Sequence, residues 1–530
     1  MWRKPRRAIL VTGLLWAVLL ATWLPAAGQD DAVSPAVAQV AGKISSEDPA
    51  GTIDVIIIYK SAPGPDKMGS LEADGATVRS VFSAVDAVAA QIRASDITDL
   101  ADDPDVVWIA WDAPLSGQLD LARKVANADS VRVGLAPKIL RPNGKGVTVA
   151  VVDSGVAPHG DLSGRLMLSL DLTQEPPKLG PPADPYGHGT HVAGIIAGNG
   201  MKSKGLYRGI APAANVISVR VLDENGQGQT SSVLAALDWI LANRGAMGIK
   251  VVNLSLGHPV FDPAEKDPLV LSVERLWQEG IVVVCSAGNW GKLGYFTVTS
   301  PGISRRVITT GSRTDWNTAD PLDDIVSTYS SRGPTAFDHY LKPDMVAPGN
   351  RIISLRAPDS TLDIEYSEWQ ITAPGAGKPD YFEMSGTSMA APMVAGAAAV
   401  MLEVEPLLGP DAIKARLMHS AAKMPGDDAF ARGAGSLDLQ AAVKDRSWTS
   451  YSPSPIVFAD LESQTIEIES TADLWGDACF DLPLMWGDGA IWGDGAIWGD
   501  GAIWGDTAIW GDAAIWGDTA IWGDTAIWGD

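Results

Sequence analysis

The chain has 530 residues, with 64 acidic and 40 basic side chains and a formal net charge of −24. At roughly 150 residues per domain, this length predicts about three units. Hydrophobic residues make up 46% of the chain, which allows a large core and excludes disorder throughout. The negative charge argues against nucleic acid, whose binding depends on cation–phosphate attraction, and against anionic membrane surfaces.

The N-terminus has the features of a secretory signal. Basic side chains crowd the first seven residues, an apolar run follows from 8 to 24, and Ala26, Ala27 and Gly28 offer small residues for cleavage. An uncleaved anchor is the alternative, because the run approaches the lower length for spanning a bilayer. We expect residues 1–28 to be removed and the protein to be secreted, with no membrane contact afterwards.

The segment after this signal predicts a small domain. Residues 29–50 are small and polar and predict a loose lead-in. Residues 51–116 predict an α/β unit, with strands at 54–59 and 106–111 and helical composition over 69–100. About 60 residues make a marginal fold alone, so we expect this unit to rest on a partner surface.

From Gly146 to about Val443 the chain alternates apolar strands with helical stretches. Near-continuous apolar runs are typical of strands covered on both faces of a parallel sheet. They lie at 147–152, 216–221, 251–254, 281–285 and 307–310, and helices are expected at 190–197, 231–244, 269–279 and 388–403. The pattern predicts an α/β fold: an open, mostly parallel sheet with helices on both faces.

The cysteine content excludes a disulfide framework. Cys285 and Cys479 are the two cysteines of the sequence, too few to brace a small exported domain. Cys285 ends an apolar run that predicts a buried strand, whereas a reactive thiol needs a partly exposed setting. We therefore expect Cys285 to be a packing residue.

Three polar residues stand where strands are expected to end or helices to begin, which is where α/β folds place their sites. Asp153 closes a strand, His188 enters an apolar helix, and Ser388 opens a helix of small residues. A serine hydroxyl needs an adjacent base, imidazole is the usual base, and a carboxylate on its other nitrogen fixes the tautomer. These residue types indicate serine acyl transfer.

The segments around these residues resemble the subtilisin-like serine peptidases, the subtilases of peptidase family S8. The order Asp, His, Ser along the chain is that of subtilisin. The motifs are DSGV at 153–156, HGTHVAG at 188–194 and GTSMAAP at 386–392, with further family-like stretches at 253–257, 286–289, 329–334 and 341–349. The resemblance runs from about Gly144 to Val443, within a catalytic domain expected at 117–446.

The resemblance implies a serine endopeptidase that cuts proteins or peptides through an acyl-enzyme intermediate. It assigns the triad to Asp153, His188 and Ser388, and the oxyanion donors to the Asn289 side chain and the backbone N–H of Ser388. The implied substrate-binding residues are Ser255, Leu256, Gly257, Ser286, Ala287, Gly288 and Trp290. Trp290 is expected at the rim of the primary specificity pocket. Because 253–257 and 286–290 contain no acidic residue, we expect an apolar side chain before the cut bond.

Residues 51–116 are similar to the inhibitor propeptide of this family, an α/β unit that helps the protease fold and blocks its cleft. An unrelated small domain is the alternative. The resemblance implies a zymogen with its own propeptide as an intramolecular inhibitor. We expect it to process itself within residues 113–122; the sequence does not define the bond.

No cofactor and no metal are expected to be required. Many subtilases bind calcium, and Asp161 matches one family ligand. The loop that would supply the other ligands carries Lys202, Lys204 and Arg208, whereas a hard cation prefers oxygen ligands and negative charge. A structural Ca²⁺ site at Asp161 is therefore only weakly indicated. His191 follows His188 by three positions, but no H-E-x-x-H motif is present, and we interpret His191 as a packing residue.

The C-terminal part is acidic and repetitive. Residues 447–485, with Pro453 and Pro455, predict a linker, and residues 486–530 repeat the unit W-G-D-x-A-I. From 447 to 530 there are 15 acidic residues and no basic ones. The even period places every Trp on one face of a strand. A β-structured stacking or interaction module, including a left-handed β-helix, and a disordered tether both remain open, with cell-surface retention as one outcome.

Two other classes of function compete with the endopeptidase. A binding or surface-attachment protein would use the fold only as a scaffold, and such a pseudo-enzyme would usually have lost one of Asp153, His188, Ser388 or Asn289. A serine hydrolase of non-peptide esters or amides would share the triad, but here the triad lies among peptidase-like cleft segments.

Overall fold

The computed structural model describes residues 32–48, 50–73, 75–117, 142–174, 176–314, 324–424, 428–460, 465–468 and 484–485. The described residues fall into two compact units, one from Ala32 to Phe458 and another that includes Ala459–Glu467. The expected signal at 1–28, the repeats at 486–530 and Cys479 lie outside the described residues.

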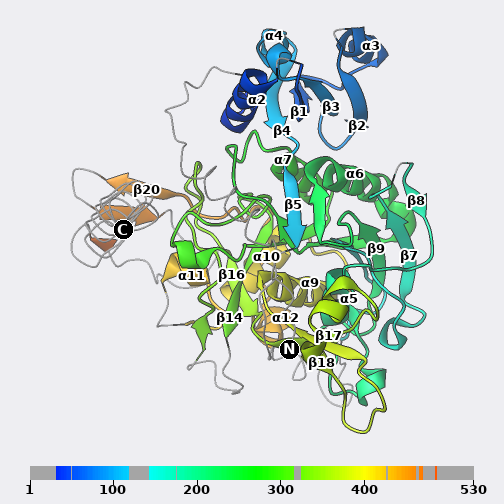
Figure 1. Cartoon of the computed structure of the whole chain (residues 1–530). Coiled ribbons are helices and arrows are strands. Elements are labelled where there is room, and N and C mark those ends of the chain that lie inside the picture. The colour runs from blue at the N-terminus through cyan, green and yellow to red at the C-terminus, as the bar shows by residue number, and fades with distance from the viewer. Residues whose placement is uncertain are drawn as a thin grey trace, which may run out of the picture. The chain divides into compact units, whose positions relative to one another are not determined.

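The first folded region is a four-stranded antiparallel sheet of order β2-β3-β1-β4 (Figure 1). Its elements are α2 (Pro35–Glu47), β1 (Thr52–Tyr59), α3 (Pro65–Ala73), β2 (Thr77–Phe82), β3 (Ala87–Arg93), α4 (Ile97–Ala101) and β4 (Val106–Trp111). The expectation of helix over 69–100 is wrong for its centre, where β2 and β3 pair. The alanines of β3 resemble a helix in composition, but β3 is an inner strand, and its small side chains are buried on both faces.

Residues 35–47 form helix α2 where the composition predicts a loose lead-in. Pro35 stands at the first helical position, where its fixed φ suits the helix and its missing N–H costs nothing. Val37 and Ala41 are buried in the core that this region forms for itself. The helix thus completes the small domain.

Strand β1 divides its side chains between two cores with the period of two expected of a strand. Ile53, Val55 and Ile57 face the small domain's own core, and Ile56 and Ile58 join the core of the following domain. The small domain therefore rests one sheet face on a partner surface, as its size predicts.

The main sheet has the order β15-β14-β13-β11-β6-β9-β7-β8, with β16 also paired to β14. Its strands are β6 (Thr148–Asp153), β7 (Leu166–Asp171), β8 (Lys178–Leu179), β9 (Asn215–Arg220), β11 (Ile249–Leu254), β13 (Val282–Ser286), β14 (Ile308–Thr314), β15 (Ile325–Val326) and β16 (Met345–Pro348). All neighbours are parallel except the two-residue edge strands β8 and β15. The predicted fold class is confirmed.

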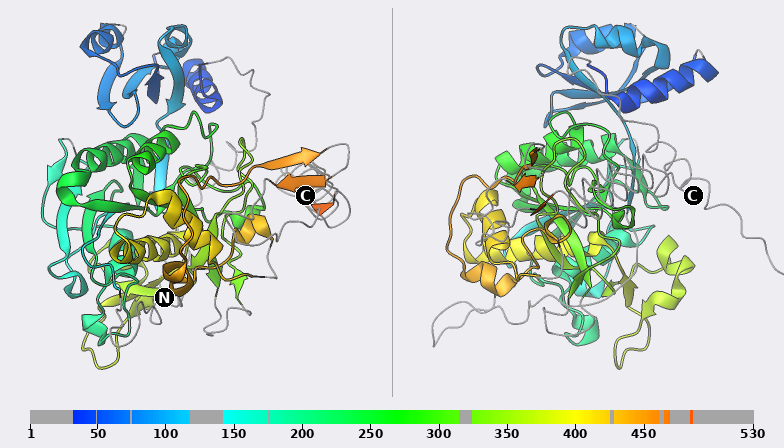
Figure 2. Two further views of the ribbon diagram at one scale, coloured as in Figure 1. Left: turned by 180° about the vertical axis from the view of Figure 1, so that it is seen from behind. Right: turned by 90° about the vertical axis from the view of Figure 1, so that its left-hand side faces the viewer.

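Helices cover both faces of this sheet (Figures 1 and 2). The helices are α5 (His188–Ala197), α6 (Thr230–Met247), α7 (Pro268–Gln278), α8 (Thr361–Glu365), α9 (Thr387–Val404), α10 (Pro410–His419), α11 (Ala429–Arg432) and α12 (Leu439–Lys444). Helices α5 and α9 pack together, and α6 packs beside α7. In length and composition α9 would suit a membrane span, but 89% of its span is buried inside the protein, as in a core helix.

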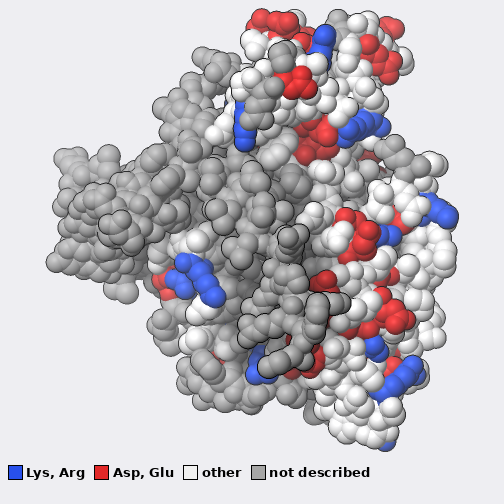
Figure 3. Space-filling view, viewed as in Figure 1, with Lys and Arg blue, Asp and Glu red and all other residues white. Residues whose placement is uncertain are grey.

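Three short sheets accompany the main one. Strands β17 (Ile352–Leu355), β19 (Tyr381–Met384) and β18 (Gln370–Ile371) form one, and β20 (Val457–Asp460), β21 (Thr465–Ile468) and β22 (Leu484–Met485) form another. The third consists of β10 (Gln227–Gln229), β5 (Pro114–Gly117) and β12 (Leu256–Gly257), with β5 in the middle. Acidic and basic side chains are interspersed on the described part of the face in Figure 3.

Residues 447–458 lie against the catalytic domain, where the proline spacing predicts a linker. Ser452 and Ser454 are fully buried. The backbone N–H of Leu341 donates to the carbonyl of Pro455 at 2.8 Å, and the backbone N–H of Val457 donates to the carbonyl of His339 at 2.9 Å. This strap, as we call residues 447–458, belongs to the catalytic domain; prolines occur here because the strap is extended, not because it is free.

Candidate active site

Asp153 and His188 meet at the carboxyl edge of the main sheet. Asp153 is the last residue of β6, and His188 is the first residue of α5. Nδ1 of His188 lies 2.7 Å from Oδ1 of Asp153, and the N–H of Ser154 donates to the same oxygen at 2.7 Å. Both side chains are fully buried. The base and the carboxylate predicted to orient it are therefore in direct contact.

This contact determines which nitrogen of the His188 imidazole carries the hydrogen. A carboxylate only accepts hydrogen bonds, so Nδ1 of His188 carries the hydrogen. Burial alone lowers the pKa of His188, but the charge and hydrogen bond of Asp153 outweigh burial, and the net pKa is raised. Nε2 has no hydrogen-bond partner among the described residues. The ring can take up a proton at Nε2, and Asp153 stabilises the imidazolium that results.

Ser388 lies in the first turn of α9, after Gly386, whose φ of 148° suits a glycine. Its Oγ donates to the carbonyl of Ser255 at 3.1 Å, and Ser255 Oγ donates back to the Ser388 carbonyl at 2.9 Å. Asn253 supports this pair of hydrogen bonds, because its Nδ2 donates to Ser255 Oγ at 2.9 Å. The hydrogen bond from Ser388 to His188 is the one link of the predicted triad that this structure does not form. Such catalytic contacts often tighten only when substrate is bound.

Asn289 is held by the residue that precedes Ser388. Its Oδ1 accepts from the N–H of Thr387 at 2.9 Å and from the Thr387 hydroxyl at 3.1 Å. Because both partners donate, the amide is oriented with its oxygen toward Thr387. Nδ2 is buried and has no partner among the described residues. Asn289 therefore keeps two N–H donors unused, which is what an oxyanion donor requires.

The cleft segment Ser255–Gly257 lies beside the chain's own strand β5. Leu256 pairs with Gly117, and Gly257 pairs with Ser116, in antiparallel register. On the other side, β10 pairs antiparallel with β5, Gly228 opposite Leu115. The structure thus brings the predicted cleft residues Leu256 and Gly257 against an extended peptide.

The second predicted cleft wall, Ser286 to Trp290, follows the end of β13. Ser286 and Ala287 are buried, and Ala287 is bonded through its backbone to Thr310 and Thr299. Gly288 has a φ of +111°, and a Cβ there would lie 2.6 Å from Ser331 Oγ, so glycine is required. Trp290 is half-buried, and its N–H donates to Ser331 Oγ at 3.1 Å.

The surroundings of Asp161 do not fit a calcium ion. One carboxylate oxygen accepts from the N–H of Lys202 at 2.8 Å, and the other accepts from the Tyr381 hydroxyl at 2.6 Å. Donors therefore occupy both oxygens that would face a cation, and a lysine backbone supplies one of them. Among the described residues no group of three or more His, Cys, Asp or Glu is gathered as a metal site.

His191 is bonded to the backbone of strands β17 and β19. Its Nε2 lies 3.1 Å from the carbonyl oxygens of Ile352 and Phe382, so this nitrogen carries a hydrogen and donates. Burial, with the nearby His188, lowers the pKa of His191 to about 3 and keeps the ring neutral. Cys285 is likewise buried, and burial raises its pKa to about 12. Both residues have the settings of packing residues.

Two residues at the site escaped the sequence analysis. Thr387 orients Asn289, and Asp184 makes a buried cluster of hydrogen bonds beside the Asp153–His188 pair. Thr387 lies inside the GTSMAAP motif, which was a signal of its importance. Asp184 precedes His188 by four positions in a loop, and its sequence neighbours carry no such signal.

Comparison with known proteins found relatives of this chain. The model of the subtilase family matches residues 144–436. Serine protease AprX of Bacillus subtilis is 42% identical over 305 residues, which cover 57% of this chain and 66% of AprX, just under two thirds. Subtilisin E of the same species is 31% identical over 418 residues, covering 77% of this chain and 93% of subtilisin E.

A solved structure shows the same fold. Fervidolysin from Fervidobacterium pennivorans, a keratinolytic enzyme related to subtilisin, matches with a TM-score of 0.60 at 23% identity, over 76% of this chain and 62% of its own. With the family match and the identity to subtilisin E, the chain belongs to the subtilase family of serine peptidases.

Proposed function

We propose that this chain is an exported serine endopeptidase, made as a zymogen that removes its own propeptide. The Ser388 hydroxyl attacks the scissile carbonyl while Nε2 of His188 takes its proton, and Asp153 stabilises the imidazolium. Asn289 Nδ2 and the N–H of Ser388 donate to the oxyanion. His188 then protonates the leaving amine, and water releases the acyl group from Ser388.

The observation that carries this proposal is the position of β5 as the middle strand between β10 and β12. Peptides are commonly recognised by adding a strand to an exposed sheet edge, because the backbone hydrogen bonds do not depend on sequence. Strand β5 follows directly from β4 of the small domain. It therefore lies in the manner of a bound substrate, which supports residues 51–116 as an inhibitor-type propeptide.

Polar contacts between the small domain and α6 support the same role. Asp112 accepts from the N–H of Ser231 at 2.8 Å, where a carboxylate favours the N-terminus of a helix. From the catalytic side, Asp238 accepts from the N–H groups of Ser83 at 3.0 Å and Ala84 at 2.8 Å. These contacts hold the small domain while β5 occupies the cleft.

The register of β5 narrows the proposed processing bond. Gly257 and Leu256 pair with Ser116 and Gly117, and the next cleft residue is Ser255, whose carbonyl accepts from Ser388 Oγ. The reactive serine is thus reached directly beyond Gly117, and we place the bond within two residues of it, inside 113–122. We also propose apolar residues before the bond, protein substrates outside the cell, and no requirement for a metal.

The test compares wild type with Ser388→Ala, both expressed with the full chain in an exporting, protease-deficient host. The N-terminal sequence of the secreted wild type should begin within two residues of Gly117, and the wild type should hydrolyse a peptide substrate. Ser388→Ala should begin after the signal, keep residues 51–116 attached and be inactive. Trimming of the inactive variant at the same bond, or peptide hydrolysis by it, would overturn the proposal.

A further inference from the structure

A second buried carboxylate lies behind the Asp153–His188 pair. Asp184 is 6% exposed and stands in the loop that leads into α5. Its Oδ1 accepts from the Ser154 hydroxyl at 2.8 Å and from the N–H of Gly187 at 2.7 Å. Its Oδ2 accepts from the N–H of Thr190 at 2.8 Å and from the Thr190 hydroxyl at 2.6 Å. Both oxygens are therefore fully used.

The hydroxyls of Ser154 and Thr190, which both donate to Asp184, also accept hydrogen bonds from neighbouring backbone N–H groups. Ser154 Oγ also accepts from the N–H of Gly189 at 2.9 Å, and the N–H of Ser154 binds Asp153. Thr190 Oγ1 accepts from the N–H of Ala157 at 2.8 Å. The segment after β6 and the first turn of α5 are thus joined through one carboxylate.

Close packing makes this junction sensitive to small displacements. A Cβ at Gly155 would lie 2.1 Å from the carbonyl oxygen of Ala183, and one at Gly189 would lie 2.1 Å from the carbonyl oxygen of Gly155. The backbones are in contact at these glycines, so the segments that carry Asp153 and His188 pack directly against each other.

The hydrogen-bond directions favour the ionised form of Asp184. Two of its partners are backbone N–H groups, which can only donate, and the two hydroxyls each already accept a backbone hydrogen bond. These hydrogen bonds lower the pKa of Asp184, but burial outweighs them and the net pKa is raised. The negative charge of Asp184 adds to that of Asp153 in raising the pKa of His188.

We infer that Asp184 is a positioning residue of the peptidase reaction. Through its hydrogen bonds with Ser154 and Thr190 it fixes the positions of Asp153 and His188 relative to each other. It also adds a second negative charge near the imidazolium. This role rests on the proposed function. It acts on the chemical step and not on peptide binding, because β10 and β12 supply the binding edges.

The experiment uses Asp184→Asn in the full chain, with the concentration of active enzyme measured by titration with a covalent serine-directed inhibitor. We expect kcat to fall about 10- to 100-fold, the scale of a small misplacement of catalytic groups, with KM within about threefold. The acidic limb of the kcat/KM profile should move to lower pH, because the pKa of His188 falls when the charge is lost.

Two further variants separate charge from geometry. Thr190→Val keeps the charge of Asp184 but loses both hydrogen bonds of the Thr190 hydroxyl, so kcat should fall while the acidic limb stays in place. Glu368→Gln removes one exposed negative charge elsewhere and should change neither quantity. If Asp184→Asn matures too slowly to yield processed enzyme for steady-state kinetics, the rate of its slow self-processing against pH supplies the same readout.

The outcomes are distinguishable from failure of the proposed function. If Ser388→Ala were as active as wild type, the function itself would be wrong whatever Asp184 does. If Ser388 is essential and Asp184→Asn keeps kcat within twofold and an unmoved acidic limb, only the role of Asp184 is refuted.

Discussion

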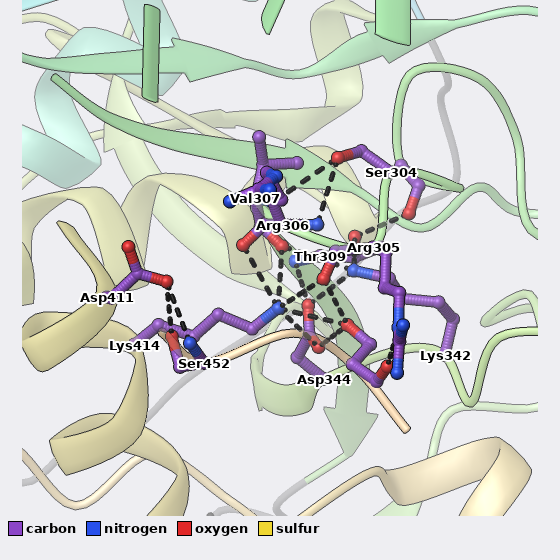
Figure 4. Close-up of polar contacts among 12 residues, drawn as sticks. Ser304, Arg305, Arg306, Val307, Thr309, Lys342, Asp344, Asp411, Lys414 and Ser452 are labelled. Carbon is purple, nitrogen blue, oxygen red and sulfur yellow. Dashed lines mark hydrogen bonds and ion pairs between the residues drawn. The ribbon is translucent and has the colours of Figure 1, made fainter. Parts of the chain in front are cut away.

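The ammonium group of Lys414 lies 2.9 Å from the hydroxyl of Ser454, and both side chains are completely buried. The same ammonium bonds to the carbonyl oxygens of Arg305, Arg306 and Val307 and pairs with Asp344 at 3.1 Å (Figure 4). Asp344 also accepts from the Ser454 hydroxyl at 2.5 Å. The strap is therefore anchored in a buried polar cluster of the catalytic domain.

Ser454→Ala should destabilise the protein by about 1–3 kcal/mol, because it leaves Lys414 and Asp344 each without one buried partner. Urea unfolding of the inactive Ser388→Ala background, which cannot digest itself, measures the change. Ser450→Ala is the matched control, since Ser450 is exposed, and it should fall within about 0.5 kcal/mol of the parent. Equal stability of the two serine variants would show that the strap adds nothing.

Deletion of residues 475–530 should leave kcat/KM on a small neutral peptide nearly unchanged. The triad and cleft segments precede the strap, and the tail's charge acts only within a Debye length of about 8–10 Å. The truncated enzyme should differ instead in retention on cells or in self-association. Loss of most small-peptide activity would mean that the repeats pack on the catalytic domain.

Asn289→Ala should lower kcat by about 10²–10³-fold, the loss found when such a donor is removed from a subtilisin, because Nδ2 is the unused side-chain donor at the site. Thr387→Val removes one of two bonds that orient Asn289 and leaves the other, so its loss should be smaller, about tenfold or less. Steady-state kinetics on one peptide ranks the two variants. The reverse ranking would remove Asn289 from the oxyanion site.

We expect Asp262 to make the contact with the small domain sensitive to pH. It is 4% exposed and lies near Ser34 and Trp108 of the small domain. Burial raises its pKa from 3.8 to about 7, the nearby Asp267 adds to the rise, and Lys266, 4.0 Å from the Trp108 ring, opposes it. The docked state binds the extra proton, so docking is strongest at acidic pH and weakens as pH rises toward about 7.

Between these limits the docking equilibrium constant changes by at most about tenfold per pH unit. Thermal unfolding of Ser388→Ala, with and without Asp262→Asn, measures the effect across pH 5 to 8. The asparagine variant should gain stability relative to its parent as pH rises to about 7, with no further change above that. A difference between the two proteins that is constant with pH would contradict the assignment.

The sequence predicted the positions of Asp153 and His188 in the fold because motif and topology agree. Asp153 and His188 lie at a strand end and a helix start, and in a parallel sheet these positions share one edge, so residues distant in the chain meet there. The role of Asn289, three residues after the end of β13, is implied by the family resemblance and stays a prediction. Their roles rest on local patterns that can be seen in a few consecutive residues.

What escaped prediction depends on tertiary contacts. The inner strand β3 is rich in alanine and resembles a helix until both its neighbours are known. The strap has the proline spacing of a linker, and only the buried Lys414 shows that it is anchored. Asp184 binds Gly187 and Thr190 in its own stretch of sequence, but the partner that links it to the Asp153 segment, Ser154, lies 30 residues earlier, so no short stretch of sequence contains the whole cluster.

In the proposed mature enzyme β5 has left, and β10 and β12 remain with an empty strand position between them. Whatever fills that gap must be locally straight for several residues and must offer its main-chain groups on both sides. A helix or a tight turn must unfold locally before it can do so. We therefore expect target choice to depend less on the amino-acid sequence of a substrate than on how readily one of its segments unfolds into an extended strand.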